Sequence, residues 1–257
     1  MRALENEAFS IPSAAGRRGS ALFVHGLGGG PYEIRWLAEA LHARTGLGVR
    51  GFHLPGHEAP RTFMPASRHE DWTAAVAREM RDLAANGPVH LVGFSNGGTV
   101  CLRVAETEPM SGKLVLLAPF VDVFRPAWLP VRPEVLLDAF AGLGGVPRRG
   151  ARLGDPEVLR AVRRCLPFRT MSLDAARSGK ALGEAALRDL AKVKVPVLIL
   201  QGARDGVVDP AGARKIEAGL TGEKRLVVLP RSDHLIALDV ERERVFDEVT
   251  AFLAHSL

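Results

Sequence analysis

The amino-acid sequence predicts an α/β fold in which a mostly parallel sheet is flanked by helices and carries a small helical cap insertion. Short runs rich in Val, Leu and Ile alternate along the chain with amphipathic stretches. Several of these runs are nearly continuous in apolar residues, which is typical of strands covered on both faces. A length of 257 residues, with 47% hydrophobic and 25% charged residues, suits a single globular domain.

The predicted core strands are residues 21–26, 47–56, 89–95, 113–120, 195–202 and 224–230. Residues 31–45 predict a helix, because apolar side chains recur at i, i+3, i+4 and i+7 from Ile34 and Pro31 suits a first turn. A similar pattern in residues 245–253 predicts a helix that closes the domain. Helices between successive strands imply parallel pairing with right-handed crossovers.

One connection between predicted strands is far longer than a crossover helix requires. We predict that residues 121–191 form a cap over the strand ends, and that residues 1–120 and 192–257 form the core. Helix-like pieces lie at residues 134–143, 156–166 and 180–191. Apolar side chains such as Trp128 and Phe140 favour a hydrophobic cover for part of a bound molecule.

Composition argues against several classes of function. The net charge is +5 and the pI about 9.7, but the arginines are scattered and the densest patch, residues 147–152, lacks aromatic residues, so no nucleic-acid partner is expected. Neither a transmembrane run nor a signal peptide is evident, so we expect no integral membrane association and a cytoplasmic location. Cys101 and Cys165 indicate no disulfide framework, and no zinc-like spacing occurs, so no cofactor or metal is expected.

A candidate nucleophile, Ser95, lies in the motif Gly93-x-Ser95-x-Gly97, where a predicted strand gives way to a helix. On such a turn the hydroxyl projects at the helix N-terminus, and small neighbours allow strained backbone angles. A serine that only caps the helix is the alternative. The strand before it and the partners described next favour the nucleophile.

A serine needs a base to accept its proton, and His234 is the best placed of the histidines. It lies in a polar turn between the last predicted strand and the last helix, at the sheet edge where Ser95 would stand. His25, His53 and His57 are weaker candidates because they precede the serine, whereas the usual chain order is serine, acid, histidine.

The acid that orients the histidine should follow a strand between Ser95 and His234, and Asp205 fits this place. Asp209 precedes Pro210 and has the position of a helix N-cap, while Asp233 adjoins the histidine and would point away from its ring. We therefore rank Asp205 first.

An oxyanion hole requires two N–H donors. One belongs to the residue after the nucleophile, Asn96, and we assign the other to Leu27 in the glycine-rich loop of residues 25–30. A glycine-rich loop before a helix also binds phosphate in some proteins, but here neither a Walker lysine nor the GxGxxG spacing is present.

Together these motifs resemble the α/β-hydrolase superfamily, and within it the bacterial carboxylesterase and monoacylglycerol lipase group. The resemblance spans nearly the whole chain and rests on HGLGGGPYEIRWLAEAL, LPGH, GFSNGG, LILQGARDGVVDP and SDHLIALDVERERVFDEVTAFL. It implies an α/β-hydrolase fold, a cofactor-independent esterase for acyl or monoacylglycerol-like esters, a triad at Ser95, Asp205 and His234, and oxyanion donors at Leu27 and Asn96. The group often has an aromatic residue where Leu27 stands and Met, Leu or Gln where Asn96 stands.

We therefore expect a serine hydrolase whose substrate is a small-molecule ester with a hydrophobic arm. The sequence is compatible with a homodimer. A serine triad does not by itself choose the bond that is broken, so a thioesterase or a carbon–carbon bond hydrolase is an alternative. For the latter, Arg125, Arg132 and Arg169 are candidates to bind a substrate carboxylate. A non-catalytic receptor for a small ligand is a further alternative.

Overall fold

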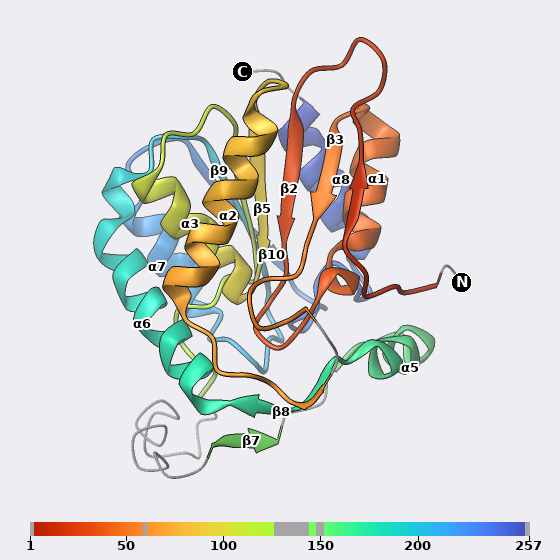
Figure 1. Cartoon of the computed structure of the whole chain (residues 1–257), viewed down its shortest axis with the longest axis vertical. Coiled ribbons are helices and arrows are strands. Elements are labelled where there is room, and N and C mark those ends of the chain that lie inside the picture. Colours follow the sequence, from red (N-terminus) through yellow and green to blue (C-terminus); the bar gives the residue numbers. More distant parts are fainter. Residues whose placement is uncertain (1–2, 59–60, 126–143, 148–151, 255–257) are drawn as a thin grey trace.

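The computed structural model of the chain describes residues 3–58, 61–125, 144–147 and 152–254. Its centre is a seven-stranded sheet with helices on both sides, which confirms the predicted α/β architecture (Figure 1). The strand order is β1 (Phe9–Ile11), β3 (Gly48–Gly51), β2 (Ser20–Val24), β5 (Val89–Phe94), β6 (Leu114–Leu117), β9 (Val197–Gly202) and β10 (Lys224–Leu229). All neighbours pair in parallel except β1, an antiparallel edge strand that the sequence analysis missed.

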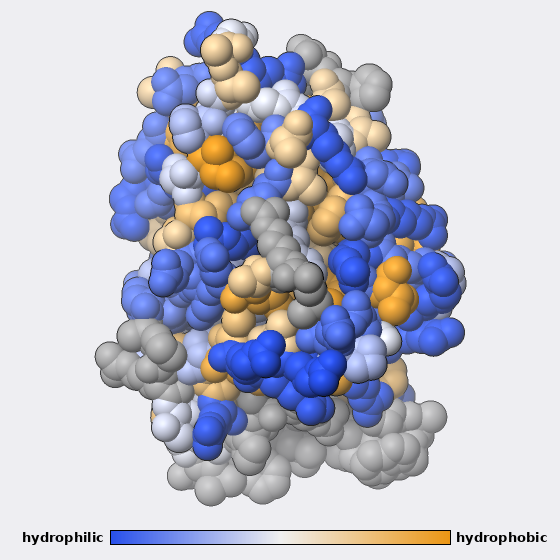
Figure 2. Space-filling view, turned by 90° about the vertical axis from the view of Figure 1, so that its right-hand side faces the viewer, coloured by the Kyte–Doolittle hydropathy of each residue, from blue (hydrophilic) through white to orange (hydrophobic). Residues whose placement is uncertain are grey.

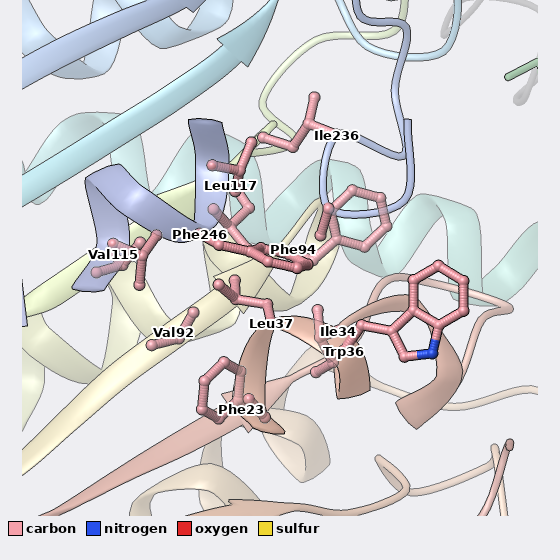
Figure 3. Close-up of a cluster of buried hydrophobic side chains, with 14 of the residues drawn as sticks. Phe23, Ile34, Trp36, Leu37, Val92, Phe94, Val115, Leu117, Ile236 and Phe246 are labelled. Carbon is pink, nitrogen blue, oxygen red and sulfur yellow. The ribbon is translucent and has the colours of Figure 1, made fainter. Parts of the chain in front are cut away.

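The central strands are buried on both faces, which explains their continuous apolar runs. On β6, Leu114 and Leu116 pack into one hydrophobic cluster, and Val115 and Leu117 pack into the cluster on the other face. Figure 3 shows part of the second of these clusters, in which Val115 and Leu117 lie close to Phe94 and Phe246. An alternating pattern would have left one face polar and unable to receive a layer of helices.

Each face of the sheet has its own helices. Helices α1 (Arg35–Thr45) and α8 (Arg242–Ala254) cover one face, and α2 (His69–Ala84), α3 (Asn96–Thr107), α6 (Leu173–Asp189) and α7 (Ala211–Gly219) cover the other (Figure 1). Pro31 lies in a separate 3-10 turn, η1 (Pro31–Glu33), and not in the first turn of α1.

The predicted insertion contributes to a smaller, three-stranded sheet in the order β4 (Arg61–Phe63), β8 (Phe168–Ser172) and β7 (Gly145–Pro147). Strand β4 comes from outside residues 121–191, so two separate segments build this region. Helix α5 (Pro156–Cys165) matches a predicted helical piece, whereas α6 begins before residue 180 because Ser172 caps it at Ala175 N. A 3-10 turn, η2 (Leu190–Lys192), follows α6. The predicted helix at residues 134–143, with Arg132 and Trp128, lies outside the described residues, and the division into core and cap stays a prediction.

The N-terminal segment packs against α1 and α5: Trp36 Nε1 donates to Ala3 O, and Cys165 Sγ contacts Leu4 O at 3.3 Å.

On the face shown in Figure 2, hydrophilic residues predominate and apolar residues gather near the middle. Within the described part of the chain, no helix is long and apolar enough to span a membrane, and no cluster of three or more His, Cys, Asp or Glu side chains is arranged to hold a metal ion.

A buried histidine on β5 makes the stability of the fold depend on pH. Burial, together with the charges of Lys113 and Arg17, lowers the pKa of His90 to about 4, and its Nδ1 accepts a hydrogen bond from Lys113 N. The imidazole is therefore neutral when folded, whereas in the unfolded chain it takes up a proton near pH 6.5. Between these values the unfolded state binds more protons, so stability falls as the pH falls.

Replacing His90 with Asn keeps an acceptor near the Nδ1 position and removes the proton uptake. We expect the unfolding free energy of the wild type to fall relative to His90→Asn by about 2–3 kcal/mol between pH 7 and pH 4, since one pKa unit corresponds to about 1.4 kcal/mol. Urea unfolding of both proteins across this range measures the difference. A difference that does not change with pH would contradict the expectation.

Candidate active site

Ser95 occupies a strained turn between β5 and α3, with φ 53° and ψ −125°. Only glycine fits two residues before and two residues after it: a Cβ at Gly93 would lie 2.4 Å from Gly97 O, and one at Gly97 would lie 2.3 Å from His25 O. Close backbone packing on both sides of the turn therefore holds Ser95 in this strained conformation. The conformation places the serine at the N-terminus of α3.

The three residues predicted as a triad form one hydrogen-bonded chain. His234 Nε2 lies 3.0 Å from Ser95 Oγ, and His234 Nδ1 lies 2.8 Å from Asp205 Oδ2. They follow the C-terminal ends of β5, β9 and β10, at the lower edge of the sheet in Figure 1, where β6 lies between β5 and β9. With the Nδ1 proton held by the carboxylate, Nε2 is available to accept the serine proton.

Asp205 is built to remain an anion although only 2% of its surface is exposed. Its Oδ1 accepts hydrogen bonds from Val207 N and Val208 N, each at 2.9 Å, and Oδ2 accepts one from Gln201 Nε2 at 3.0 Å. Burial acts to raise the pKa of Asp205, but His234 and the backbone donors outweigh it, and the pKa lies below its usual value. The carboxylate can therefore stabilise an imidazolium.

The two competing acids have other partners. Asp209 Oδ1 accepts from Ala211 N at 2.9 Å at the start of α7, in keeping with a capping role. Asp233 Oδ1 accepts from His234 N at 2.7 Å and from Gly206 N at 3.4 Å. All three of these hydrogen bonds come from backbone N–H groups and not from the imidazole.

Two buried carboxylates that the sequence analysis missed hold the loop of His234. Asp239 Oδ2 accepts from Asp233 N at 2.7 Å, and its Oδ1 accepts from Gly154 N at 2.9 Å, before α5. Glu241 Oε2 accepts from Arg231 N and from Ser232 Oγ, each at 2.8 Å. Residues that follow His234 in the chain therefore hold its loop in place. Asp239 also connects this loop to Gly154, which precedes α5.

In the glycine-rich loop, the residues on both sides of Leu27 are held by hydrogen bonds from their backbone N–H groups. Gly26 N donates to Glu33 Oε2 at 2.8 Å, and Gly28 N donates to His57 Nε2 at 2.9 Å. Within the ranges that the structure describes, the N–H groups of Leu27 and Asn96 have no hydrogen-bond acceptor. These are the two donors predicted for the oxyanion hole, and both are available to a ligand.

Histidines that precede the serine support this loop. Burial lowers the pKa of His57 to about 4, so its ring is neutral and Nε2 can accept from Gly28 N while Nδ1 faces Pro55 O at 3.2 Å. His25 Nε2 accepts from Leu54 N at 3.0 Å. His53 lies beside His25, with 6.1 Å between ring centroids.

We expect Glu33→Ala to lower kcat about tenfold to a hundredfold with a smaller effect on KM, because the loop that positions Leu27 loses its acceptor. Glu33 is buried, and its carboxylate fills the space beside Gly29, where a Cβ would lie 2.2 Å from its oxygens. Glu33→Gln retains an acceptor of the same shape and should recover most of kcat. Steady-state kinetics with p-nitrophenyl butyrate test both variants, and an unchanged kcat in Glu33→Ala would contradict this role.

Comparison with known proteins gives consistent findings. A model of the alpha/beta hydrolase family matches residues 21–248. A thermostable monoacylglycerol lipase of Bacillus sp. (strain H-257) is 30% identical over 239 residues, covering 91% of this chain and 89% of the lipase. A carboxylesterase of Bacillus subtilis (strain 168) is 22% identical, covering 91% of this chain and 92% of the esterase.

A solved structure from work on LipS and LipT, two metagenome-derived lipolytic enzymes, superposes with a TM-score of 0.81 at 27% identity. The similarity covers 98% of this chain and 99% of the other. It therefore includes the segments that carry the serine, the aspartate and the histidine.

Proposed function

Because the chain belongs to the alpha/beta hydrolase family, we propose that it is a serine hydrolase that cleaves carboxylic esters through an acyl-enzyme on Ser95. The observation that carries the proposal is the chain of contacts from Ser95 through His234 to Asp205, at 3.0 and 2.8 Å. The similarity to a monoacylglycerol lipase and a carboxylesterase supports an acyl or monoacylglycerol-like ester as substrate.

In the proposed reaction, His234 Nε2 takes the proton of Ser95 as its Oγ attacks the ester carbonyl. The N–H groups of Leu27 and Asn96 hold the oxyanion of the tetrahedral intermediate. The imidazolium then protonates the leaving alcohol, and water attacks the acyl-enzyme with the same histidine as base. Release of the acid restores the hydroxyl of Ser95.

A hydrophobic arm on the substrate is supported by partly buried apolar side chains in the oxyanion loop, just after β3 and on β8. Leu27, Phe52 and Met171 lie against the core on the face of α2, α3 and α6. An acyl chain packed against these side chains would leave water and form apolar contacts, which is favourable. A homodimer and a cytoplasmic location stay predictions.

The direct test is hydrolysis of 1-monobutyrin, p-nitrophenyl butyrate, butyryl-CoA and a diketo acid by one preparation of the protein. We expect kcat/KM to be highest for the two oxygen esters. Faster cleavage of butyryl-CoA or of the diketo acid would favour the thioesterase or the carbon–carbon bond hydrolase instead. Ligand binding without turnover of any compound would favour a receptor.

A further inference from the structure

The side chain of Asn96 is an unpartnered polar group next to the nucleophile. Only 2% of the residue is exposed, and both amide atoms, Nδ2 and Oδ1, are buried without a hydrogen-bond partner among the described residues. Burying an amide in this way costs free energy unless a partner satisfies it. The free protein thus maintains an unfavourable group at the strained turn that carries Ser95.

The amide lies where α6 passes the N-terminal end of α3. A Cβ at Gly179 of α6 would lie 3.0 Å from Asn96 Oδ1 and 3.9 Å from Phe120 Cε1. The absence of a side chain at Gly179 therefore leaves room for the amide, with the ring of Phe120 on the same side. Glycine within a helix lowers its stability, so this arrangement has a cost in α6 as well.

We propose that the Asn96 amide hydrogen-bonds a hydroxyl group of the substrate that lies close to the scissile carbonyl. A hydroxyl both donates and accepts, so a single group can pair with Oδ1 and Nδ2. The backbone N–H of the same residue is the proposed donor to the carbonyl oxygen, so the amide and this donor belong to one residue next to the nucleophile. This inference rests on the proposed ester hydrolysis and specifies its substrate as a hydroxylated ester.

Two matched pairs of esters test the inference and identify the side of the ester that carries the hydroxyl. Ethyl 3-hydroxybutyrate against ethyl butyrate varies the acyl side, and 1-monobutyrin against propyl butyrate varies the alcohol side. We expect the wild type to prefer the hydroxylated member of one pair by roughly tenfold in kcat/KM, since a site built around a hydroxyl leaves polar groups unpaired with the plain analogue.

Asn96→Leu has the same branching at Cγ and removes both polar atoms. The ratio of kcat/KM between the hydroxylated and the plain ester should therefore fall to near one, whatever the overall rate. The same variant should raise the Tm by about 2–4 °C, because a buried unpaired amide is replaced by an apolar group. A residue with a purely structural hydrogen-bonding role would lower the Tm instead. Gly179→Ala, which crowds the amide, should also reduce the preference and provides a second variant should Asn96→Leu fail to fold.

The results separate this inference from the proposed function. Hydrolysis of all four esters without a preference in either pair, or a preference that survives in Asn96→Leu, would overturn the role of Asn96 and leave ester hydrolysis standing. A lower Tm in Asn96→Leu would also overturn it. Failure of the wild type to hydrolyse any of the four esters would remove both.

Discussion

Replacing Ser95 with Ala is expected to lower turnover of p-nitrophenyl butyrate by a factor on the order of 10³ or more and to abolish labelling by a fluorophosphonate probe. The variant retains the N–H groups of Leu27 and Asn96, so substrate binding and polarisation of the carbonyl can persist. It lacks the atom that forms the acyl-enzyme. KM should therefore change far less than kcat.

Ser67 provides a matched control. It is 8% exposed, as Ser95 is, and its Oγ has no hydrogen-bond partner within the described part of the chain. Ser67→Ala should keep both turnover and labelling, with the label located at Ser95 by mass spectrometry. Turnover retained in Ser95→Ala, or a label on another residue, would show that the nucleophile has been misassigned.

The sequence was sufficient to predict six of the seven strands of the main sheet and the three contacting residues, because their signals are local. Long apolar runs mark buried strands, and Ser95, Asp205 and His234 lie one, three and five residues after the ends of such runs. Parallel strands bring their carboxyl ends to one edge, so position in the chain translates into proximity.

The supporting residues were missed because their roles depend on tertiary contacts. Glu33 looks like an ordinary acid near a helix start, yet its carboxylate turns inward to Gly26 N. Asp239 and Glu241 act on backbone groups that precede them by up to ten residues, and their sequence context resembles the beginning of a surface helix. Strands such as β4 and β7 are only three residues long, too short for a hydrophobic period to be recognised.

Asp205→Asn should lower kcat by about 10³- to 10⁴-fold while the protein remains folded. An amide at this position can donate to His234 Nδ1, which favours the tautomer with its proton on Nε2. That nitrogen then cannot accept the proton of Ser95. The backbone donors Val207 and Val208 still find an acceptor in the amide oxygen, so the loop should hold its shape.

Asp209→Asn and Asp233→Asn are the matched controls, because they make the same chemical change at the two competing acids. Each should keep kcat within about threefold of the wild type, since their contacts are to backbone N–H groups that an amide oxygen can also accept. Kinetics with p-nitrophenyl butyrate and thermal unfolding of all three variants make the comparison. If Asp209→Asn or Asp233→Asn lost activity while Asp205→Asn kept it, the orienting acid would have to be reassigned, because the 2.8 Å contact between Asp205 and His234 would then have no part in catalysis.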